Sequence, residues 1–106
     1  MENLLTLAKQ TLSIVSTATA KDEEIKALIQ AGILDMQRRG IDVSATDTNQ
    51  LKISTIMMFV KGHFGNVEIK EKELAQKTYE LLCLNLSLSE DYRGNSNVWC
   101  IFKINI

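Results

Sequence analysis

The sequence predicts a small all-α fold, and three observations carry this prediction. The 106 residues contain no proline, and the five glycines stand apart along the chain rather than in clusters. Apolar side chains recur every three or four residues, which is the spacing of one helix face, and they mark about four helices. The length suits a single domain with one core. We expect residues 1–94 to form a helical domain and residues 95–106 to form an irregular or short-strand apolar tail.

The first two helices are predicted from their apolar faces. A short helix is expected over Asn3–Val15. A second is expected to begin at Asp22, whose carboxylate suits an N-cap, and to end at Gly40, which suits the left-handed C-cap. In the loop that follows, Ile41 and Val43 are the large apolar residues able to tuck it against the core. The second helix has the most regular apolar face: Ile25, Leu28, Ile29, Gly32, Ile33 and Met36.

A third helix is expected to lie at the centre of the fold. Asp47 and Gln50 have the spacing of a capping box ahead of Leu51–Phe64, and Gly65 is expected to close the helix. This segment is apolar on nearly every side. Such a helix requires other helices or neighbouring subunits around it.

The fourth helix is expected over Glu68–Leu88. The face of this helix opposite its apolar side is predicted to be charged and to face solvent, with Glu73 and Lys77 four residues apart in the favourable order. Serine, aspartate and glycine residues after Ser87 are expected to break it. The predicted inner face is Ala75, Tyr79, Leu82 and Leu86.

No pattern in the sequence indicates catalysis, and we expect neither an enzyme nor a cofactor. His63 is the single histidine and has no second ligand at the spacing that a zinc site requires, so we expect it to be structural. Cys83 and Cys100 form no CxxC motif, and we expect both to be inert in a reducing cytosol. We therefore predict no catalytic, cofactor-binding or metal-binding residues.

Charge and hydropathy restrict the kinds of partner. Twelve basic and thirteen acidic residues give a net charge of −1, which argues against strong binding to nucleic-acid phosphates. No apolar run approaches the roughly 20 residues that a membrane span needs, so we expect no membrane partner. A small helical DNA-binding regulator stays open as the alternative. The polar residues of the second and third helices that would face DNA are Gln37, Arg38, Arg39, Asn49, Gln50 and Lys52.

The excess of apolar residues favours a component of an assembly. Met57 and Met58 lie in the over-apolar third helix, and Trp99, Phe102 and Ile104 lie in the tail. Large apolar side chains on a small domain often anchor interfaces. We take these five residues as a tentative interface. Two readings of the tail stay open: it contacts a partner by adding a strand or filling a groove, or it folds back on its own helices.

Two segments carry a resemblance to a known family. They are Val60–Gly65, with the pattern Val-Lys-x-His-Phe-Gly, and Tyr79–Ser89, with the pattern Tyr-x-x-Leu followed by Leu-Ser-Leu-Ser. Together with Asp22–Ile25 and Gly40–Val43, in this order and spacing, they resemble the small head-tail connector proteins of tailed bacteriophages, which are often labelled DNA-packaging proteins. The resemblance covers residues 4–92, and the segment 96–106 has no counterpart in it.

The resemblance implies an all-helical subunit of the virion that acts at the head-tail junction. About a dozen copies would form a ring beneath the portal protein, with a tail-side completion protein below, after assembly in the cytoplasm of the bacterial host. DNA would pass through the ring without sequence-specific binding. The tentative interface residues would then contact the next subunit or the portal.

Overall fold

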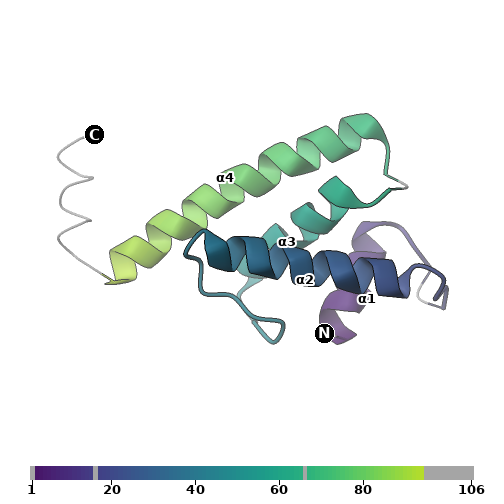
Figure 1. Cartoon of the computed structure of the whole chain (residues 1–106), viewed down its shortest axis with the longest axis horizontal. Coiled ribbons are helices and arrows are strands. Elements are labelled where there is room, and N and C mark those ends of the chain that lie inside the picture. Colours follow the sequence, from purple (N-terminus) through teal and green to yellow (C-terminus); the bar gives the residue numbers. More distant parts are fainter. Residues whose placement is uncertain (1, 16, 66, 95–106) are drawn as a thin grey trace.

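The computed structural model describes residues 2–15, 17–65 and 67–94. This part of the chain folds into four helices joined by loops (Figure 1). These residues contain no strand, which confirms the all-α fold. The expected strand in the tail lies outside the described residues, and the division between residues 94 and 95 stays a prediction. The helices are α1 (Glu2–Thr11), α2 (Asp22–Arg38), α3 (Gln50–His63) and α4 (Ile69–Gly94).

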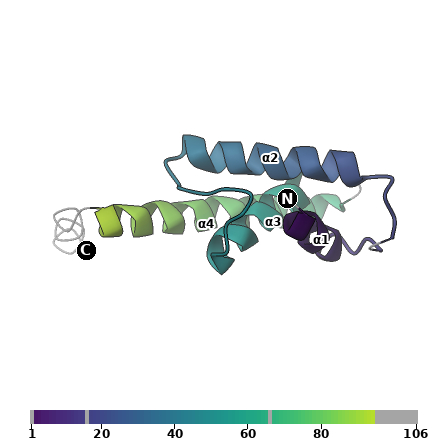
Figure 2. The same cartoon turned by 90° about the horizontal axis from the view of Figure 1, so that it is seen from below.

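Helix α3 packs against each of the other three helices, which confirms its predicted central position (Figures 1 and 2). Its Ile56 and Val60 are fully buried. Helix α2 contributes the buried face that its spacing predicts, and Ile41 and Val43 of the following loop are also buried. The core is therefore one apolar cluster that draws on every helix.

Two glycines bring the helices close to one another. A Cβ atom on Gly32 of α2 would lie 3.0 Å from the ring of Phe59 on α3. A Cβ atom on Gly62 of α3 would lie 2.8 Å from the side chain of Gln76 on α4, whose amide donates a 2.7 Å hydrogen bond to the Gly62 carbonyl. Because neither glycine has a side chain, α2 and α4 can both approach α3 closely at these points.

Helix α2 ends as the sequence predicts. Gly40 has a φ of 86°, in the left-handed region, directly after the C-cap Arg39. The amides of Gly40 and Ile41 donate to the carbonyls of Gln37 and Met36, which completes a Schellman motif. Ile41 and Met36 are both buried, as is common for the two ends of this motif.

Helix α1 is shorter than predicted, because the same motif ends it early. Ser13 has a φ of 61°, and the amides of Ser13 and Ile14 donate to the carbonyls of Gln10 and Lys9. The sequence does not predict this ending of the helix, because serine rarely adopts the left-handed conformation. The apolar residues after Thr11, among them the exposed Val15, therefore do not extend the helical face.

Both predicted N-caps are wrong. The N-cap of α2 is Lys21, which makes no side-chain capping bond, while the carboxylate of Asp22 lies 2.6 Å from the buried ammonium of Lys9. A buried cation requires a nearby anion, and this need draws Asp22 towards α1. In α3 the cap is Asn49, whose side chain accepts from the amides at 51 and 52. Asp47 instead accepts from the amide of Asn49.

Helix α4 continues six residues beyond its predicted end at Leu88 and reaches Gly94. The serines and aspartate in this segment lower helix propensity by less than about 1 kcal/mol each, which is not enough to stop a helix without proline. Its buried face also differs by one position. Cys83 is buried with Ala75, Tyr79 and Leu86, whereas Leu82 is only half-buried. Helix α3 likewise ends one residue early, with Phe64 as its C-cap in an extended conformation, so Gly65 does not close it.

Replacing Gly40 with alanine is expected to lower the free energy of unfolding by about 1–2 kcal/mol, because a Cβ atom is strained at positive φ. No atom lies within 4 Å of the position that this Cβ would occupy, so crowding adds nothing to the cost. Urea denaturation monitored by circular dichroism measures the change.

The matched control is Gly65→Ala. Gly65 also has open space around its Cβ position, but its φ lies outside the left-handed region. This substitution is expected to leave stability unchanged or to raise it by a few tenths of a kcal/mol. Equal losses at the two positions would contradict the role assigned to Gly40.

Candidate functional site

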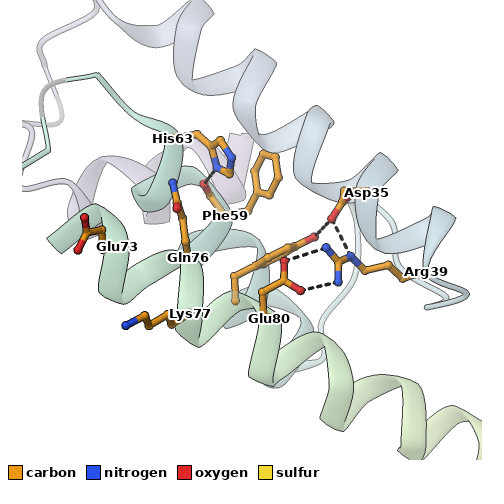
Figure 3. A pocket seen from close by; sticks show the side chains of 9 residues that line it. Asp35, Arg39, Phe59, His63, Glu73, Gln76, Lys77 and Glu80 are labelled. Carbon is orange, nitrogen blue, oxygen red and sulfur yellow. Dashed lines mark hydrogen bonds and ion pairs between the residues drawn. The ribbon is translucent and has the colours of Figure 1, made fainter. Parts of the chain in front are cut away.

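A polar cluster joins the end of α2 to the middle of α4 (Figure 3). The hydroxyl of Tyr79 donates to a carboxylate oxygen of Asp35 at 2.5 Å, and Arg39 Nε donates to the same oxygen at 2.9 Å. The guanidinium of Arg39 also forms two parallel hydrogen bonds with Glu80, at 2.7 and 2.9 Å. Arg39 lies over the ring of Tyr79, 5.4 Å from its centroid. Long side chains therefore tie α4 to α2.

The electrostatics of this cluster favour the charged form of Asp35. Burial raises the pKa of Asp35, but the hydrogen bonds from Tyr79 and Arg39 and the positive charge of Arg39 outweigh that effect, so its pKa lies below the usual 3.8. Burial and the bond to Asp35 raise the pKa of Tyr79 well above its usual range. Tyr79 is thus a permanent hydrogen-bond donor at physiological pH.

The polar cluster lines one side of a cleft between α2, α3 and α4, and an aromatic group lines the other side (Figure 3). His63 stacks on Phe59 with ring centroids 4.2 Å apart, and its Nδ1 donates to the Phe59 carbonyl at 2.9 Å. Phe59 in turn meets Tyr79 edge to face at 5.2 Å. His63 is exposed and ends α3, and its contacts are those of a packing residue.

The charged groups of Asp35, Arg39 and Glu80, which line the cleft, bind one another within the subunit. In residues 2–15, 17–65 and 67–94 no three histidine, cysteine or acidic side chains lie close enough to hold a metal ion. Cys83 is buried, and burial raises the pKa of its thiol, so it stays protonated and unreactive. Cys100 lies outside the described residues. The chemistry of the cluster is that of a structural clamp.

Two of the five tentative interface residues lie in the described part of the chain, and both border one groove between α1 and α3. Met57 is buried in the core, whereas Met58 is half-buried. Leu7 of α1 and Ile53 of α3 line the same groove, and Leu7 is partly exposed. Trp99, Phe102 and Ile104 lie outside the described residues.

The outer face of α4 carries an apolar stripe in addition to the predicted charged residues, since Glu73 and Lys77 are both exposed. Leu74, Leu81 and Leu84 are 66%, 63% and 57% exposed. Their spacing of seven and three residues places them on one side of the helix, opposite the buried face that contains Tyr79. The pairing of Glu73 with Lys77 predicts a charged face and gives no sign of this stripe. The seven-residue spacing of leucines was the signal that would have revealed it.

Residues predicted to face DNA are largely engaged within the subunit. Arg39 is held by Asp35 and Glu80. Lys52 is buried, donates to the carbonyl of Asp42 and lies 3.9 Å from a carboxylate oxygen of Asp47. The side chain of Asn49 caps α3. These contacts leave few free polar groups for reading a base edge.

Replacing Tyr79 with phenylalanine is expected to lower the free energy of unfolding by about 1.5 kcal/mol at pH 7, because it removes a hydrogen bond to a charged group and keeps the ring. The pKa of Asp35 is lowered by folding, so its stabilising contribution is present above pH 3.8 and is lost as the pH falls through the folded pKa. The difference between wild type and variant should therefore narrow below about pH 4. Denaturation series between pH 7 and pH 2.5 measure it.

Glu80→Gln is the control from the same cluster. The side chain of Glu80 is more than half exposed, so losing its ion pair is expected to cost less than about 1 kcal/mol, and the loss should shrink further in high salt. A Tyr79→Phe effect that stays constant down to pH 2.5 would show that Asp35 is not the partner that matters.

Comparison with known proteins identifies the family of the chain. The model of the family described as phage connector protein matches residues 4–93, which is most of the sequence. No curated protein and no solved structure gives a significant match. Among the described residues, no helix is long and apolar enough to cross a membrane. The chain therefore belongs to the phage connector protein family and is a structural connector component of a phage virion.

Proposed function

We propose that this connector forms a closed ring of about a dozen subunits beneath the portal, and that phage DNA passes through its centre. The portal protein lies above the ring and a tail-side completion protein below it. The ring assembles in the cytoplasm of the bacterial host. The membership of the connector family supports a place at the head-tail junction.

The observation that carries the proposal is the amount of apolar surface left outside the core. The groove that Met58 borders lies between α1 and α3, whereas the exposed leucines of α4 lie on the side of α4 that faces away from α3. A small monomer rarely leaves several large apolar side chains exposed in rows. Apolar surface on more than one face suits head-to-tail contacts, in which the two subunits use different surfaces, and such contacts form a ring when the rotation between subunits closes.

The charge of the subunit suits a wall along which DNA slides. Each phosphate held by a lysine or arginine adds to affinity and slows passage. The net charge of −1 means that basic residues do not outnumber acidic ones, and Arg39 and Lys52 are engaged within the subunit. A neutral wall prevents DNA from adhering during packaging and ejection.

We assign the tentative interface residues to two contacts. Met58, with Met57 behind it, contacts the next subunit through the groove between α1 and α3. Methionine suits such a contact because its flexible side chain fits an irregular partner surface. Trp99, Phe102 and Ile104 of the tail contact an adjacent subunit or the portal.

Met58→Asp is expected to abolish the ring and to leave the helices intact. The aspartate places a charge in an apolar contact, where it cannot be solvated. Gel filtration and negative-stain images measure ring formation, and circular dichroism measures helix content. A Met58→Asp variant that still forms rings would remove this residue from the interface.

Ala31→Asp is the matched control, because Ala31 is an exposed residue on α2 outside the groove. It introduces the same charge on a helix surface and is expected to leave rings intact. Loss of rings in both variants would indicate a general effect of negative charge rather than a specific contact.

Random-sequence duplex DNA is expected to bind the protein weakly or not at all at low salt, because few phosphates are neutralised. Fluorescence anisotropy of labelled DNA, measured at salt concentrations from about 20 to about 200 mM, tests this. A DNA-binding regulator would show measurable affinity that falls steeply with salt.

A further inference from the structure

The outer face of α4 carries a row of exposed leucines. Leu74, Leu81 and Leu84 are each more than half exposed, and the half-buried Leu88 continues the same row towards the end of the helix. The opposite face of α4 is already buried in the subunit. A row of exposed leucines, even with the charged Glu73 and Lys77 beside it, favours a partner on this face as well. We call these four leucines the leucine stripe.

No other described part of the subunit lies over the leucine stripe, but the sequence contains a segment that suits it. Twelve residues follow Gly94, and half of them are large and apolar. Fully extended, they reach about 40 Å, whereas Leu74 and Leu88 are about 21 Å apart along the helix. The segment is therefore long enough to cover the stripe. Its large apolar residues are Val98, Trp99, Ile101, Phe102, Ile104 and Ile106.

The position of Gly94 favours a stripe on a neighbouring subunit. The last turns of α4 project beyond the other helices, so Gly94 lies at an extremity of the described structure (Figures 1 and 2). A chain leaving from this point must reverse its direction to cover its own α4. A neighbour that lies beyond this end of α4 would be reached without such a reversal. The family match ends at residue 93 and does not include the tail.

We propose that the tail of each subunit, residues 95–106, docks on the leucine stripe of the next subunit in the ring. Each subunit then donates one tail and accepts one, and a contact of this kind closes when the subunits form a ring. This inference rests on the proposed ring and names the surface that Trp99 and Phe102 contact within it.

The test uses two full-length variants. Leu81→Asp disables the leucine stripe and keeps the tail, whereas the double variant Trp99→Ser, Phe102→Ser disables the tail and keeps the stripe. Each variant alone is expected to lose rings. When a tagged Leu81→Asp chain is mixed with the untagged tail variant, one intact tail meets one intact stripe. The tagged chain should capture at least about tenfold more of the tail variant than of an untagged Leu81→Asp chain, because the loss of one interface anchor lowers affinity by at least about tenfold.

Leu34→Asp is the control, because Leu34 on α2 is as exposed as Leu81 but lies outside the stripe. It should keep rings. Rings in both test variants would overturn tail docking and leave the ring itself standing. Equal capture in the two mixtures, with a lower melting temperature for a dilute chain lacking residues 95–106, would place the tail on its own subunit and overturn the proposal. A wild-type protein that forms no rings would overturn the proposed function, and this inference with it.

Discussion

The whole fold depends on covering one helix. Helix α3 is apolar around most of its circumference, and each side left in water would cost about 25 cal/mol per Å² of apolar surface. Helices α1, α2 and α4 all pack on it. Gly32 and Gly62 allow two of these helices to approach closely, because a side chain at either position would collide with Phe59 or Gln76. The need to cover α3 therefore sets the positions of its neighbours.

Helix α4 shows how this constraint shapes the surface. It gives one narrow face to α3, and the clamp of Asp35, Arg39, Tyr79 and Glu80 fixes its distance from α2. A helix held along one face leaves its other face free for assembly. That face carries exposed leucines among its charged residues. Stability and assembly thus use opposite sides of the same element.

The sequence predicts those features that depend on local rules. The apolar spacing of α2 and the left-handed ending at Gly40 are both confirmed, since each is decided within a few residues. The N-cap at Asp22 failed because a distant partner, Lys9, competes for its carboxylate. No local pattern reports such a contact. The extension of α4 was not predicted, although the reason is local: serine and aspartate lower helix propensity by too little to end the helix.

The candidate site was less predictable than the fold. Met57 and Met58 do border one groove, but the spacing alone did not separate the buried methionine from the half-buried one. The clamp went unpredicted, because Asp35 and Tyr79 are 44 residues apart and no periodicity joins them. The leucine stripe was not predicted, because acidic and basic residues alternate with its leucines in the sequence. Side-chain exposure, which depends on the packing of whole helices, decides all three cases.

The most direct test of the account is the molar mass of the wild-type protein, measured by light scattering over a wide concentration series. The account predicts a discrete species of about 140 kDa, a dozen copies of 11.9 kDa, that appears as concentration rises and shows a central hole in negative-stain images. A mass of 11.9 kDa at every concentration would contradict it.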